Sequence, residues 1–351
     1  MGSGYFHTTY RSEISIFQTR FVKFWLMLFF VFLAALPWMV GKYPIYLVNV
    51  SMIAIIGALG INILTGYTGQ VSLGHAAFIA IGAYSSGILT NEIGLSFWLA
   101  LPSAGIIAGF FGLIVGIPSL RLKGLYLIMA TMAFGFIIPY VLAKWASLTG
   151  GAAGMLIPYP KIGEAELNTD KEFYYLILAV TILAVLFARN LFRTRVGRAF
   201  IAIRDQEVAA KIIGVNLTKY KVLAFIISSF YAGIAGSLYA HYLTSVAPDQ
   251  FPLTLSIQYI AMIIVGGMGS IVGSICGPLF ITLLPEGLKL LADFLVGLAP
   301  FLERMVADSF FEIKNLVYGL IIVIFLIFEP DGIYGRWRTI KTYWTRWPYT
   351  Y

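Results

Sequence analysis

The sequence predicts an all-α integral membrane protein with about ten transmembrane helices, some interrupted by glycine, and with both termini in the cytoplasm. Three observations predict this fold class: 60% of the 351 residues are hydrophobic, only 11% are charged, and the charged residues lie between long apolar runs. A soluble domain carries roughly 25% charged residues, which help to cover its surface. The formal net charge of +8 is therefore interpreted as charge that orients the chain in a membrane, and not as a nucleic-acid-binding surface.

The apolar runs define the expected spans, because about 20 apolar residues in a helix cross a hydrocarbon core about 30 Å thick. Residues 43–91 contain no Asp, Glu, Lys or Arg. This run is too long for one crossing, so residues 66–70 (GYTGQ) are expected to separate two spans. A second glycine-rich interruption at residues 266–270 (GGMGS) divides the uncharged run 250–285. The expected spans are residues 24–40, 44–65, 71–90, 95–117, 124–142, 173–188, 222–243, 256–270, 272–292 and 314–328.

The distribution of Lys and Arg places the loops between these spans. If the chain starts in the cytoplasm, 17 of the 24 Lys and Arg residues lie on the cytoplasmic side, as the positive-inside rule requires. This orientation divides the chain into a cytoplasmic tail (1–23), a transmembrane domain (24–330) and a basic, aromatic cytoplasmic tail (331–351). The last of these is expected to anchor at the membrane interface.

Two loops of the transmembrane domain are long. The outer loop, residues 145–172, is rich in Gly, Pro and acidic residues and is expected to form an exposed cap. The inner loop, residues 189–221, carries eight of the basic residues. Within it, residues 199–213 contain no Gly or Pro, so a helix is expected there, ending at Gly214.

The sequence excludes several kinds of chemistry. It contains no phosphate-binding loop of the form GxxxxGK[ST], so nucleotide hydrolysis by this chain is not expected. It has only one cysteine and three scattered histidines, so a metal site is not expected either. No catalytic constellation is present, and the chain is not expected to be an enzyme. The spans contain almost no ionisable residues, which argues against an ion-driven carrier and favours energy supplied by another subunit.

The interruption at residues 66–75 is the most informative polar segment. In a membrane, the backbone groups that a helix break frees must be satisfied by protein or by water in a cavity. One interpretation places Gln70, Ser72 and His75 near the path of a solute. The other is a tight turn at the cytoplasmic face, with Gln70 and Ser72 as caps and His75 as a neutral side chain bonded to a neighbouring helix. His241, near the outer end of its span, is expected at the membrane interface.

Five segments in order resemble one family. They are residues 66–78 (GYTGQVSLGHAAF) with 82–84 (GAY), 120–126 (LRLKGLY), 194–210 (TRVGRAFIAIRDQEVAA), 265–273 (VGGMGSIVG) and 328–332 (FEPDG). Together these segments closely resemble the LivM-type permeases of branched-chain amino acid ABC importers, over roughly residues 60–335.

The resemblance implies a subunit that depends on partners in a bacterial cytoplasmic (inner) membrane. The implied partners are a LivH-like second permease, two cytoplasmic ATP-binding subunits and an extracytoplasmic solute-binding protein, with ATP bound by the partner subunits and no cofactor in this chain. The implied solutes are leucine, isoleucine and valine. The alternatives are a permease for urea, amides or other amino acids, or a stand-alone secondary carrier. The inner loop would dock on an ATPase, through the residues Arg198, Arg204, Asp205, Glu207, Lys211 and Gly214.

Overall fold

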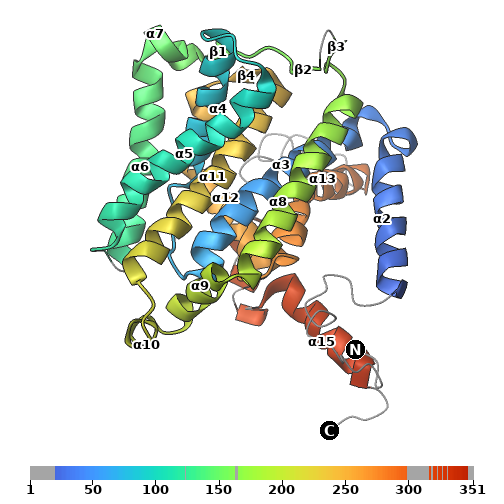
Figure 1. The fold of residues 1–351 in the computed structure, drawn as a ribbon. Helices are drawn as coiled ribbons and strands as arrows, with labels where there is room; N and C mark the ends of the chain where they lie inside the picture. Colours follow the sequence, from blue (N-terminus) through green and yellow to red (C-terminus); the bar gives the residue numbers. More distant parts are fainter. Residues whose placement is uncertain are drawn as a thin grey trace.

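The computed structural model describes residues 20–122, 124–162, 165–298, 316–317, 319–321, 323–325, 327–329 and 331–346. Long helices that run side by side dominate this part of the chain (Figure 1). The predicted all-α membrane fold is therefore confirmed. The long helices are α2 (Arg20–Met39), α3 (Lys42–Ile61), α4 (His75–Asn91), α5 (Phe97–Ser119), α6 (Leu125–Lys144), α8 (Asp170–Arg193), α11 (Leu217–Leu243), α12 (Leu253–Gly266) and α13 (Gly273–Leu298).

Further elements gather at the two ends of these helices (Figure 1). One end carries α7 (Ala146–Thr149), the 3-10 helices η2 (Gly151–Ala153) and η3 (Pro248–Gln250), and the strands β1 (Met155–Leu156), β2 (Lys161–Ile162), β3 (Ala165–Glu166) and β4 (Ser245–Val246). The opposite end carries α9 (Arg195–Asp205), α10 (Glu207–Ile212) and α15 (Gly332–Arg346). The predicted outer and inner loops thus lie at opposite ends of the molecule.

Five helical stretches among the described residues are long and apolar enough to cross a membrane, which fits a multi-pass membrane protein. They are Lys42–Tyr67, Phe97–Ser119, Leu125–Lys144, Asp170–Arg193 and Leu217–Leu243. The first includes the π-helix η1 (Asn62–Tyr67), which continues α3. Helices α4 and α12 are shorter, because a chain interruption lies next to each. Most of the predicted tail 1–23 lies outside the described residues, as do residues 314, 315, 318, 322 and 326 of the predicted span 314–328.

The interior is built on close contacts of α11 with α4 and α5, and small residues make these contacts possible. A Cβ atom on Gly236 of α11 would lie 2.0 Å from the Ile79 carbonyl oxygen of α4, and one on Gly82 would lie 2.3 Å from Gly233 Cα. On the α5 side, Gly112 faces the Ser229 hydroxyl. Small residues on facing helices allow the backbones to approach this closely.

The cap at the outer end closes over the helices. Strand β1 pairs antiparallel with β4, which places Met155 opposite Val246, and Ile157 is buried beneath the cap. His241 is fully buried, with Nε2 3.0 Å from Ser86 Oγ and Nδ1 3.0 Å from the Pro158 carbonyl oxygen. The expectation of an interfacial His241 was wrong, because the cap loop covers the end of α11.

The inner loop forms two helices where the sequence predicted one over residues 199–213. The backbone leaves the helical region at Gln206 (φ −158°, ψ 101°), so α9 ends at Asp205 and α10 begins at Glu207. Gly214, with φ 89°, ends α10 as predicted. Its N–H donates to Lys211 O and the next N–H, of Val215, donates to Ala210 O, which is the hydrogen-bond pattern of a Schellman motif.

Candidate functional site

Two interrupted helices meet near α9. The first interruption follows η1: α3 and η1 end at Tyr67, α4 begins at His75, and residues 68–74 are not helical. π-helical turns of this kind often mark functional segments. Gly69 takes φ 71°, and its N–H and that of Gln70 donate to Thr65 O and Leu64 O, at 3.1 Å each. The helix end is thus closed by local bonds that leave the Gly66 carbonyl for another partner.

The second interruption lies between α12 and α13. Gly267 and Gly269 there take φ 114° and φ 73°, conformations that glycine adopts without steric cost. Gly267 is packed against the start of α15, because a Cβ atom on it would lie 2.6 Å from Asp331 O. The glycine-rich sequence at residues 266–270 is therefore required by backbone geometry and close packing.

Asn62 joins the two interruptions. It is the first residue of η1 and is almost completely buried. Its Nδ2 donates to Ser270 O at 2.9 Å and to Ser274 Oγ at 2.7 Å, while its Oδ1 accepts from Gly269 N at 2.9 Å. One side-chain amide thus supplies partners to backbone groups that the α12–α13 interruption leaves outside a helix.

Arg204, near the C-terminal end of α9, also contacts both interruptions at the place where Asn62 joins them, and this place is the joint. Its Nη1 donates to Gly66 O at 2.8 Å. A Cβ atom on Gly269 would lie 2.5 Å from this Nη1, so the guanidinium lies beside both interruptions. A second link ties α10 to α11: Lys221 Nζ lies 2.8 Å from Glu207 Oε1.

The three residues predicted near a solute path are all buried within the chain. Gln70 Nε2 lies 3.1 Å from Thr68 Oγ1 and 3.4 Å from Lys221 O, so the structure brings Gln70 to the inner loop. His75 points elsewhere: its Nε2 lies 2.9 Å from the Gly57 carbonyl oxygen of α3. Ser72 Oγ accepts from Gly74 N at 3.3 Å. The local geometry at His75 is that of a histidine bonded to a neighbouring helix.

The predicted coupling residues fall into two groups. Arg204 and Glu207 turn toward the helix interruptions and α11, as described above. Arg198, Asp205, Lys211 and Gly214 are exposed. Sequence reasoning missed the apolar side chains of α10 and its end: Val208, Ile212 and Ile213 are 66%, 81% and 74% exposed. Exposed apolar residues on a polar loop are a signal that could have been read from residues 207–213 (EVAAKII).

A cavity of about 270 Å³ separates the first interruption from the inner loop. It is lined on one side by Thr68 and Gln70 and on the other by Arg204, Glu207 and Lys221. The cavity therefore combines an amide, a hydroxyl and charges of both signs at one end of the helices. Among the described residues, no group of three or more His, Cys, Asp or Glu side chains could hold a metal ion.

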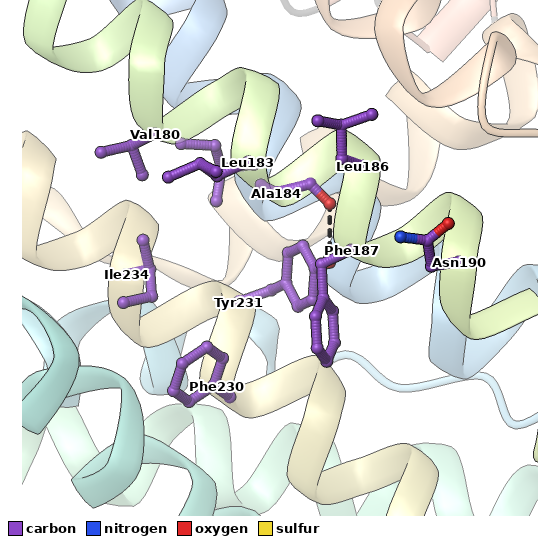
Figure 2. Close-up of a pocket in the computed structure, with 10 residues that line it drawn as sticks. Val180, Leu183, Ala184, Leu186, Phe187, Asn190, Phe230, Tyr231 and Ile234 are labelled. Carbon is purple, nitrogen blue, oxygen red and sulfur yellow. Dashed lines mark hydrogen bonds between the residues drawn. The ribbon is translucent and has the colours of Figure 1, made fainter. Parts of the chain in front are cut away.

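A larger cavity of about 520 Å³ lies between α8 and α11 and has a different character (Figure 2). Its lining is apolar apart from Asn190 and Tyr231, and the Tyr231 hydroxyl donates to Ala184 O at 2.8 Å. Figure 2 shows Val180, Leu183 and Phe187 of α8 facing Ile234 and Phe230 of α11. This lining holds no charged side chain, whereas the cavity beside the inner loop holds charges of both signs and is the candidate site.

Comparisons with known proteins identify a family and several relatives of the chain. A family described as "branched-chain amino acid transport system / permease component" matches residues 43–326. The high-affinity branched-chain amino acid transport system permease proteins LivM of Salmonella typhimurium and Escherichia coli K12 are each 32% identical over 89% of this chain and 74% of their own length. The permease protein LivH of the same transport system in Escherichia coli K12 is 25% identical over 80% of this chain and 90% of its own. No solved structure matches the chain.

Proposed function

The chain belongs to the family of permease components of branched-chain amino acid transport systems, and from this premise we propose that it is the LivM-like permease subunit of an ABC importer. Its proposed solutes are leucine, isoleucine and valine. The identity of 32% with LivM proteins over 89% of the chain carries the proposal. The chain is proposed to cross a bacterial inner membrane about ten times, with both termini and α9–α10 in the cytoplasm.

The surface of α10 supports a cytoplasmic ATPase as partner. Exposed apolar side chains that lie together on a surface often mark a protein–protein contact, because a partner that covers them removes them from water. Helix α10 lies with α9 at one end of the molecule (Figure 1). The exposed Ile212 and Ile213 belong to the end of α10, and Glu207 and Lys211 of the same helix are charged. In the proposed complex, two ATP-binding subunits, a LivH-like permease and an extracytoplasmic solute-binding protein complete the importer, and ATP is bound by the partner subunits alone.

In the proposed mechanism, closure of the ATPase pair moves α10, and this motion is passed to the membrane-spanning helices. The solute-binding protein delivers the solute at the capped end, and Gln70, Ser72 and His75 adjoin the route at the helix interruption. The scarcity of ionisable groups in the spans argues against coupling to an ion gradient.

Uptake into proteoliposomes tests the proposal. The complete importer, with this chain, a LivH-like permease, the ATPases and the binding protein, is expected to accumulate labelled leucine, isoleucine and valine only when ATP is supplied. Labelled urea and an acidic amino acid serve as competing solutes. Preferential uptake of urea would replace the proposed solutes, and uptake by the purified chain alone would favour a stand-alone carrier.

The ATPase contact is tested by Ile212→Asp. The substitution places a charge in the proposed apolar contact, so the amount of ATPase that co-purifies with the chain is expected to fall at least tenfold. Leu156→Asp is the matched control, since Leu156 is 80% exposed on the opposite end of the molecule, and its complex is expected to keep its ATPases. Equal ATPase recovery from the two variants would contradict this docking surface.

A further inference from the structure

Arg204 makes its closest contact within the chain, and not on the surface that is proposed to dock on an ATPase. Its guanidinium turns away from the exposed tip of α10 and back toward the membrane-spanning helices, where it donates to Gly66 O. Its side chain remains 41% exposed, and the residue lines the cavity beside the first interruption. The closest ion-pair distance to Asp205, its neighbour in sequence, is 3.4 Å, which makes the Gly66 carbonyl the closer partner.

The Gly66 carbonyl is a site that favours a cation. It belongs to the last turn of the continuous stretch α3–η1, where carbonyl groups have no partner within the helix. The helix dipole places partial negative charge at this end, and a guanidinium there stabilises it. Arg204 therefore satisfies a carbonyl that the helix leaves unpaired, on the buried residue Gly66.

The contacts of Asn62 and Arg204 connect the two helix interruptions, so that the two segments are expected to move together. Asn62 holds η1 to Gly269, Ser270 and Ser274 through one hydrogen bond each. Arg204 lies against both Gly66 and Gly269. A displacement of α9 thus acts on the end of α3–η1 and on the start of the α13 segment together. The second link, Glu207 to Lys221, acts on α11 instead.

We propose that Arg204 is the positioning residue that carries the motion of α9 and α10 to both interrupted helices, through the Gly66 carbonyl and the Gly269 backbone. This inference rests on the proposed function, because it takes α9–α10 to be moved by the ATPases. It assigns Arg204 to an internal contact within the permease, whereas α10 provides the contact with the ATPase.

The experiment compares Arg204→Gln with wild type in the complete importer reconstituted in proteoliposomes. The variant is expected to co-purify with its ATPases and to keep its basal ATP hydrolysis within twofold. Labelled leucine transported per ATP hydrolysed is expected to fall at least tenfold, because the motion no longer reaches the helix interruptions. Arg338→Gln, an exposed arginine on α15, is the control that keeps the wild-type ratio.

Two glycine variants test the same joint while Arg204 itself is kept. Gly269→Ala would place a Cβ atom 2.5 Å from Arg204 Nη1 at φ 73°, whereas Gly94→Ala meets no atom within 4 Å at φ 71°. The backbone strain is thus matched, and only Gly269→Ala is expected to lower the ratio of transport to hydrolysis. An unchanged ratio in Arg204→Gln, loss of its ATPases on purification, or equal effects of the two glycine variants would overturn the inference. Absence of ATP-driven uptake in wild type would instead refute the proposed function.

Discussion

Asn62 shows at the residue scale how a membrane-buried polar side chain can hold an irregular backbone in place. Its three hydrogen bonds go to residues more than 200 positions later in the chain. Asn62 is one of three asparagines in the apolar run 43–91, and nothing in the neighbouring sequence indicates its distant partners, so the sequence could not predict them. The glycines at 66–70 and 266–270 did predict the interruptions, because glycine in an apolar run marks a place where the backbone turns or approaches closely.

We expect Asn62→Ala to destabilise the folded chain. The substitution leaves the partly buried Gly269 N–H without its partner. A fully buried unpaired donor costs about 1–3 kcal/mol, so the lower end of that range, about 1 kcal/mol, is expected here. Ser270 O retains the hydroxyl of Ser274 at 3.1 Å, so this oxygen adds little. Denaturation of the purified chain in a mild detergent measures the change in the free energy of unfolding.

Asn91→Ala is the matched control for this prediction. Asn91 Nδ2 also donates to a backbone carbonyl, that of Leu156, at 2.7 Å, but in an exposed position. Substitutions at the surface usually change stability by less than about 0.5 kcal/mol. If the two variants unfold with the same free energy, Asn62 does not hold the joint.

At the scale of the elements, the spans were predictable because the hydrocarbon core sets their length and composition. The predicted spans 44–65, 95–117, 124–142, 173–188 and 222–243 each correspond to a described helix of suitable length. The helix predicted over 199–213 was wrong at one residue, because Gln206 leaves the helical region although nothing in its side chain forbids a helix. A tertiary requirement decides there: the break lets α9 point Arg204 at Gly66 while α10 projects from the end of the bundle.

The contact between α4 and α11 gives the prediction that belongs to this scale. Gly236→Ala would bring a Cβ atom to 2.0 Å from Ile79 O, and backbone atoms cannot yield without separating the helices. Overpacking of this kind costs about 1–3 kcal/mol, so we expect a lower melting temperature and a poorer yield of folded protein. Gly109→Ala is the control, since its nearest contact would be an ordinary 3.4 Å to Ile226 O. Equal melting temperatures would show that α4 and α11 do not approach as closely as described.

At the scale of the whole molecule, the two ends of the helix bundle differ in chemistry. One end is closed by the cap over residues 145–169. The other carries the basic helices α9 and α15, together with α10 (Figure 1). Hydropathy and the positions of Lys and Arg predicted this polarity. They could not predict which helices would be central: the stretch α3–η1 and α11 are the most buried of the five long spans, while α6 and α8 are the least, and this order depends on which helices pack together.

The account depends on energy reaching the permease from the cytoplasm through α9 and α10. Its most direct test labels a cysteine at position 212, in a chain whose native Cys276 is replaced by serine, with a maleimide that cannot cross membranes. We predict that Ile212→Cys is labelled in inside-out vesicles, is protected there when the ATPases are bound, and is not labelled in intact cells. Labelling of this cysteine from outside intact cells would contradict the account.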